Sequence, residues 1–193
     1  NASIGNDLKI GVYNNNSQSV DTLGVFISKP NSKQSYSKQS YSLCIDFSVN
    51  KRKDTYDVRG IAIDDKSIDR FFHSFRMAQK EYEHRIKNKI FGKNRLPGQI
   101  PVQVYQLNPQ EKNDPSSRIN EIKNKTLYPL SIEIVNSKEK QELWIYTHAA
   151  TSNPKQAAIV FSSSDDINQF LDLIDPGFVK KQYHNNFERK GKK

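Results

Sequence analysis

Two stretches of the sequence follow one pattern: IAIDDKSIDRFFHSF at residues 61–75 and AIVFSSSDDINQFLDLI at residues 158–174. Each begins as an apolar strand, continues through acidic or hydroxyl residues, and then starts a helix with isoleucine and, three residues later, phenylalanine. Aspartate and serine are typical helix N-caps, because their oxygens accept hydrogen bonds from the first free backbone amides. The repetition predicts that one sheet-and-helix unit occurs twice.

Four strands are predicted before each helix from alternating apolar residues and from the turn residues between them. In the first half they span residues 8–13, 23–29, 41–50 and 56–63, and in the second half residues 101–107, 130–136, 142–149 and 156–161. The predicted fold class is α+β, with two tandem ββββα units whose antiparallel sheets are each backed by one helix. A short match between LCIDF at 43–47 and LSIEI at 130–134 also suggests duplication, with chance similarity as the alternative.

The first helix is predicted from Asp65 to about Ile90, because apolar residues recur at the helical period of about 3.6 residues. Gly92 and Pro97 are expected to stop it. The second helix is predicted from 165 to 174. The predicted organisation has a disordered or vector-derived start at 1–7, a first unit at 8–95, a second at 99–178 and a basic tail at 179–193.

The chain carries 30 Lys and Arg against 21 Asp and Glu, a formal net charge of +9. A positive surface concentrates anions such as nucleic-acid phosphates. Basic residues gather in the predicted hairpin at Lys51, Arg52 and Lys53, between residues 76 and 95, and in the tail. The alternative is that these runs are ordinary solvated surface.

No catalytic motif is present, so we expect no enzymatic activity, no cofactor and no metal site. The single cysteine, Cys44, excludes an internal disulfide and a multi-cysteine zinc site. The acid pairs Asp64-Asp65 and Asp165-Asp166 are explained as helix caps. No apolar run approaches the about 18 residues of a membrane span. The sequence starts at Asn1 without methionine, so cytoplasmic and exported locations both stay open.

Strand alternation indicates a possible binding surface. In ELWIYTHA the aliphatic Leu143 and Ile145 lie on one face, which leaves Trp144 and Tyr146 on the other. If helices cover the aliphatic face, the aromatic face is open. The proposed nucleic-acid-binding residues are Trp144, Tyr146, Tyr105, Lys51, Arg52, Lys53 and Arg59. Stacking of bases on such rings is worth about 1–3 kcal/mol per base; burial in a second core layer or a dimer interface is the alternative.

The predicted order of elements resembles that of Whirly-type and PUR-type single-stranded nucleic-acid-binding proteins. The resemblance covers most of the chain but concerns order alone, since the Lys-Gly-Lys-Ala type of motif is absent. It implies binding of single-stranded DNA or RNA and transfers no site residue. The alternative is an exported or envelope-associated module that binds another protein or a second copy of itself.

Overall fold

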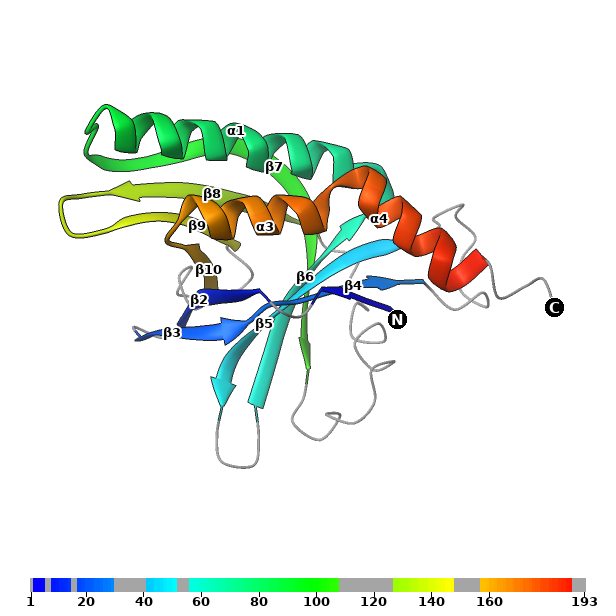
Figure 1. Cartoon of the computed structure of the whole chain (residues 1–193). Coiled ribbons are helices and arrows are strands. Elements are labelled where there is room, and N and C mark those ends of the chain that lie inside the picture. Colours follow the sequence, from blue (N-terminus) through cyan, green and yellow to red (C-terminus); the bar gives the residue numbers. More distant parts are fainter. Residues whose placement is uncertain are drawn as a thin grey trace.

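The strands join in one antiparallel sheet, and the helices lie on one side of it (Figure 1). The computed structural model describes residues 2–5, 8–14, 17–29, 41–51, 56–107, 127–147 and 157–188. The strands are β1 (Ala2–Gly5), β2 (Lys9–Asn14), β3 (Ser17–Thr22), β4 (Gly24–Ser28), β5 (Ser42–Lys51), β6 (Tyr56–Asp64), β7 (Gly92–Leu107), β8 (Tyr128–Asn136), β9 (Gln141–Thr147) and β10 (Ala157–Phe161). The helices are α1 (Ile68–Lys87), α3 (Ser164–Ile174) and α4 (Pro176–Tyr183), with a 3-10 turn at Asp65–Ser67 and a π-helical turn at His184–Glu188.

Strands β2 and β7 each pair with two other strands. The order across the sheet is β1-β4-β5-β6-β7-β8-β9-β10-β2-β3. The long strand β7 pairs with β8 from Gly92 to Val102 and with β6 from Gln103 to Leu107. In the first half, β1 pairs with β4, and β2 pairs with both β3 and β10. Thus β2, the second strand of the first half, pairs with the last strand of the second half, and β7 pairs with the last strand of the first half.

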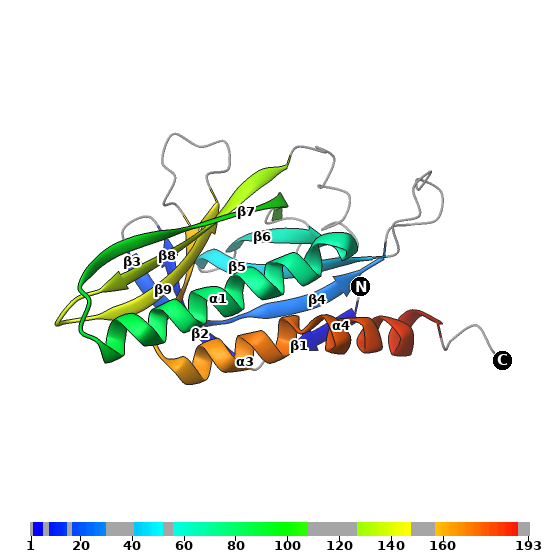
Figure 2. The ribbon, with the colours of Figure 1, turned by 90° about the horizontal axis from the view of Figure 1, so that it is seen from above.

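The α+β class is confirmed, but the expectation of two separate sheets, each with its own helix, is wrong. The pairs β6–β7 and β10–β2 join the halves edge to edge, which removes two exposed strand edges. Helix α1 of the first half packs on β7, β8 and β9 of the second, and α4 of the second half contacts β4 of the first (Figure 2). The halves are intertwined and share one core.

The registers next to the two helices correspond. Leu43 pairs with Ile27 and Ile63, and Leu143 pairs with Ile134 and Phe161. Each of these leucines thus lies beside the last apolar residue of the strand before its helix. By this criterion β5 corresponds to β9, so the expected match of residues 43–47 with 130–134 is displaced by one strand.

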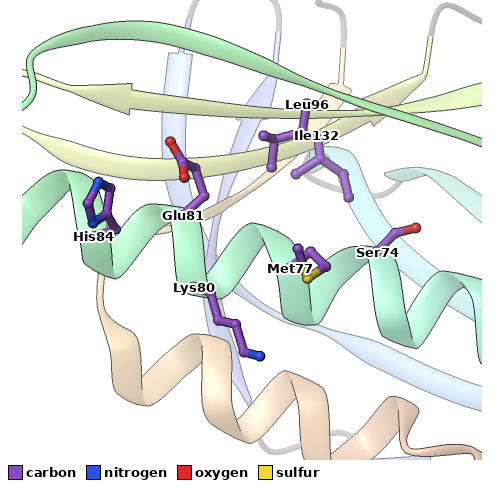
Figure 3. Close-up of a pocket in the computed structure, with 7 residues that line it drawn as sticks. All are labelled: Ser74, Met77, Lys80, Glu81, His84, Leu96 and Ile132. Carbon is purple, nitrogen blue, oxygen red and sulfur yellow. The ribbon is translucent and has the colours of Figure 1, made fainter.

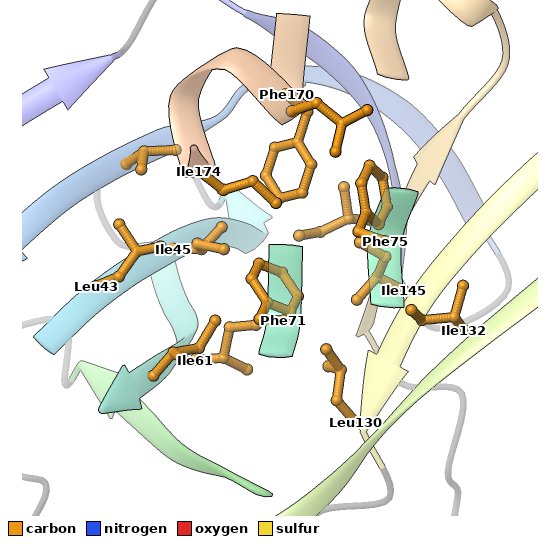
Figure 4. Close-up of a cluster of buried hydrophobic side chains, with 14 of the residues drawn as sticks. Leu43, Ile45, Ile61, Phe71, Phe75, Leu130, Ile132, Ile145, Phe170 and Ile174 are labelled. Atoms are coloured by element: carbon orange, nitrogen blue, oxygen red, sulfur yellow. The ribbon is translucent and has the colours of Figure 1, made fainter. Parts of the chain in front are cut away.

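The phenylalanines of the repeated helix motif meet in the shared core (Figure 4). Phe71 and Phe170 are both fully buried, and their ring centroids lie 6.2 Å apart at 86°. Phe75 approaches the Phe170 ring at 4.9 Å and 76°. Edge-to-face contacts of this kind add stability beyond the burial of area. The motif noted in the sequence therefore supplies the contact between α1 and α3.

Helix α3 is capped as the sequence predicts, whereas Asp64 caps the 3-10 turn before α1, whose own N-cap residue, Ser67, makes no side-chain capping hydrogen bond. The Asp64 carboxylate accepts a hydrogen bond from the Lys66 amide at 3.1 Å, and the Ser163 hydroxyl accepts one from the Asp166 amide at 3.2 Å. Burial raises the pKa of Asp64, and a hydrogen bond with the neighbouring carboxyl of Asp65 raises it further. Asp64 and Ser163 thus have a local structural role at the two strand-to-helix junctions.

Helix α1 ends at Lys87, before the expected stop residues Gly92 and Pro97, which lie in β7. The Ile90 amide donates to the Arg85 carbonyl at 2.9 Å, and the Lys89 amide donates to the Ile86 carbonyl at 3.2 Å. This is the Schellman arrangement, in which glycine usually occupies the left-handed position. Here that position is held by Lys89, with φ of 52°.

Replacement of Lys89 by glycine is expected to stabilise the protein by about 1 kcal/mol, because the left-handed conformation strains a residue with a Cβ atom. Urea unfolding followed by circular dichroism would measure the change. Lys89→Ala is the control: it also removes the charge but keeps the Cβ atom. Equal stability of the glycine and alanine variants would contradict the prediction.

Several boundaries differ from those expected. Residues 2–5 form a strand because β1 pairs with β4, and Leu173 of α3 packs against Gly5. The polar segment 17–22, expected to be a turn, forms β3 by pairing with β2. Strand β7 runs through the expected boundary at 95–99. Helix α4 extends into the expected basic tail because Val179 and Tyr183 are buried.

Candidate nucleic-acid interface

The predicted alternation along β9 is confirmed. Leu143 and Ile145 belong to the core beneath the helices. Trp144 and Tyr146 lie on the opposite face, in a separate apolar cluster with Val135, Ala158 and Val160. Neighbouring strands contribute to this cluster because Trp144 pairs with Val160, and Tyr146 with Ala158.

The two rings do not form the open surface that was expected. Trp144 is only 9% exposed and Tyr146 only 5%. Stacking requires an accessible ring face. The exposure therefore agrees with the alternative reading, in which these aromatics form a second apolar layer.

Carboxylates hold both rings in place. The Trp144 Nε1 donates to Glu142 Oε1 at 3.4 Å, and Tyr146 Oη donates to Glu133 Oε2 at 3.0 Å. Lys140 Nζ lies 3.2 Å from the same Glu142 oxygen and 6.0 Å from the centroid of the Trp144 ring. Two negative charges beside the rings disfavour the approach of a phosphate.

The surroundings of Tyr146 keep its phenol protonated. Burial raises its pKa most, and the hydrogen bond to Glu133 and the charge of that carboxylate raise it further. The charge of Arg95 acts in the opposite direction. Arg95 also donates through Nη2 to Ser131 Oγ at 2.7 Å. Tyr146 is therefore a stable donor within this face.

The other predicted residues lie elsewhere in the sheet. In the β6–β7 pair, Tyr105 is opposite Gly60 and Arg59 is opposite Gln106, so their backbones are neighbours. Lys51 ends β5, opposite Tyr56 of β6. Arg52 and Lys53 lie outside the described residues. The pairing thus places Arg59 and Tyr105 on neighbouring strands but assigns them to opposite faces of the sheet, and on other strands than Trp144 and Tyr146.

Helix α1 presents cations that the predicted site did not include. Arg70, Arg76, Lys80 and Lys87 are all exposed, together with the acidic Asp69 and Glu83. Arg85 is ion-paired with Glu81 at 2.9 Å. The run of basic residues from 76 to 95 indicates charge here, but the helical spacing is needed to show which cations share the outer side.

A groove lies between α1 and the strands β7 and β8 (Figure 3). Its volume is about 630 Å³, and its lining combines apolar and polar side chains: Ser74, Met77, Lys80, Glu81, His84, Leu96 and Ile132. Met77 is 63% exposed, unusually high for an apolar side chain on this helix. The sequence analysis missed this groove. The feature of the sequence that could have indicated the groove is Met77, an apolar residue on the polar face of the predicted helix.

Within the described ranges, no three His, Cys, Asp or Glu side chains are grouped so that they could hold a metal ion. His73 and His84 are exposed on α1, and His84 Nδ1 lies 3.0 Å from Asn88 Nδ2. None of the helices described is both long and apolar enough to cross a membrane.

Comparison of the chain with family models, with curated proteins and with solved structures found no match.

Proposed function

We propose that this chain is a non-enzymatic binding protein for single-stranded DNA or RNA. The observation that carries the proposal is the order of elements: four strands precede α3, and the four predicted strands precede α1 together with the additional strands β1 and β3. This order is similar to that of Whirly-type and PUR-type proteins. The intertwined pairing, in which each half lends a strand to the other, fits a protein built from two such units. Proteins with the same order of elements can differ in function, so the charge of the chain is the second observation in favour of nucleic-acid binding.

The charge favours a ligand bound mainly through its phosphates. The net charge is +9, and α1 exposes Arg70, Arg76, Lys80 and Lys87. Arg59 stays a predicted phosphate contact, whereas the β6–β7 register assigns Tyr105 to the other face of the sheet, so Tyr105 is not part of the same surface. Because the rings of Trp144 and Tyr146 are buried beside carboxylates, base stacking on them is not part of this proposal.

Fluorescence anisotropy with labelled single-stranded DNA and RNA would test the function. If four phosphates are neutralised, the affinity is expected to fall about 50-fold between about 50 and 200 mM salt. The variant Arg76→Glu with Lys87→Glu should weaken binding further, whereas Lys138→Glu in the β8–β9 turn serves as a single charge-reversal control. A flat anisotropy at low salt with both oligonucleotides would exclude the proposal.

A protein-interaction module is the second candidate. The observation that favours it is the groove beside α1, where Met77 is 63% exposed. Exposed apolar surface rimmed by polar residues is typical of protein-binding sites. No response to oligonucleotides, together with a dimer that forms with rising protein concentration, would favour this reading over the first.

A further inference from the structure

The groove beside α1 has an apolar floor and an adaptable apolar wall. Ile132 is 1% exposed, and Leu96, its partner in the β7–β8 pair, is partly buried against the core. Met77 lies on the facing helix and is 63% exposed. Methionine is flexible and polarisable, so it adapts to apolar groups of different shapes. The groove can therefore accept apolar side chains of a ligand.

The corresponding surface of the other half is closed. There the helix breaks at Asp175, whose carboxylate caps α4 by accepting from the Phe178 amide at 2.9 Å. Helix α4 then buries Val179, and the Tyr183 ring stacks on Tyr41 with centroids 4.4 Å apart. Helix α1 has no such break over its 20 residues. Because α1 runs on without a break, its outer side leaves the groove open.

The charges around the groove favour an acidic ligand. Lys80 lines it, and exposed Arg70 lies one helical turn before Ser74 on the same side of α1. The carboxylate in the lining, Glu81, is already paired with Arg85. Along α1, the lining from Ser74 to His84 spans about 15 Å. That length suits a peptide with more than one anchor residue.

We propose that this groove binds a segment of a partner protein that carries apolar anchor side chains flanked by carboxylates. The anchors would pack between Met77 and the Leu96–Ile132 pair, and the carboxylates would face Arg70 and Lys80. Arg70 lies on the groove side of α1, whereas Lys80 is one turn from Arg76 and therefore lies at the border between this site and the proposed nucleic-acid contacts of Arg76 and Lys87.

Methyl NMR provides a direct test, because Met77 is the only methionine of the chain. The probe is a synthetic heptapeptide with two leucines flanked by glutamates, titrated into protein labelled with 13C at the methionine methyl group. The single signal is expected to shift and saturate. A matched peptide with serines in place of the leucines should bind at least about tenfold more weakly, since two buried apolar side chains are lost. One with lysines in place of the glutamates should be weaker by about tenfold as well.

Two double variants with equal charge change separate a specific site from general attraction. Arg70→Glu with Lys80→Glu should lower the affinity for the glutamate peptide about tenfold. Lys180→Glu with Lys181→Glu, two exposed cations of α4, should lower it by less than about threefold. Circular dichroism would verify that both fold.

The proposal is overturned if the methionine signal does not move with the glutamate peptide, or if both double variants weaken it equally. It is also overturned if a single-stranded oligonucleotide shifts the signal and competes with the peptide, because the groove would then belong to the nucleic-acid surface. If the anisotropy shows no oligonucleotide binding but the peptide still shifts the methionine signal, the proposed function is rejected and the peptide site is retained.

Discussion

Replacement of Phe71 by alanine is expected to lower the free energy of unfolding by about 3–5 kcal/mol, because the ring is fully buried and its loss leaves a cavity. The effect should extend to both halves, since Phe71 of α1 contacts Phe170 of α3. Urea unfolding would be followed by circular dichroism, which reports all helices and strands, and by the fluorescence of Trp144, the only tryptophan. Both transitions should move to lower urea by the same amount.

Met77→Ala is the matched control for this prediction, since it truncates an exposed apolar side chain on the same helix. It should change the stability by less than about 0.5 kcal/mol. A shift of the dichroism transition without a shift of the Trp144 fluorescence would show that the halves unfold separately, against the shared core.

Replacement of Trp144 by alanine is expected to cost about 3 kcal/mol of stability, because the ring is 9% exposed and packs on Val135 and Val160. It also leaves Glu142 without the Nε1 donor. Thermal and urea unfolding by circular dichroism would measure the loss. Trp144→Phe, which keeps an aromatic ring, should cost about 1 kcal/mol.

Oligonucleotide affinity of the Trp144 variants decides between a packing residue and a stacking residue. At a temperature where all proteins are folded, we expect Trp144→Ala to bind single-stranded DNA or RNA as the unchanged protein does. A Trp144 variant that is folded but binds more weakly would show that the ring contacts bases and that the interpretation of this face as a packing layer is wrong.

Local sequence patterns predicted the elements but not their partners. Alternation located most of the strands, and it put Leu143 and Trp144 on opposite faces, as observed. The pairing of β2 with β10 joins residues far apart in the chain, such as Ala157 and Asn14, and no local pattern specifies such a pair. The polar strand β3 is stabilised by pairing with β2 rather than by its own composition.

Part of the candidate site was also predictable, and part was not. Periodicity assigns a residue to a face, but what packs on that face decides exposure, so the burial of Trp144 and Tyr146 could not be derived. The groove required knowledge that α1 lies over β7 and β8 of the other half. Only the exposed Met77 within a polar helix face hinted at it.

The pairing of β2 with β10 has a consequence for biosynthesis. Strand β2 is translated about 145 residues before its neighbour β10. Until then, β3 is the strand paired with β2, which also contacts β5, and α1 has no strands of the second half to cover. A nascent chain of this kind exposes apolar surface for most of its synthesis, which is the condition under which chaperones bind.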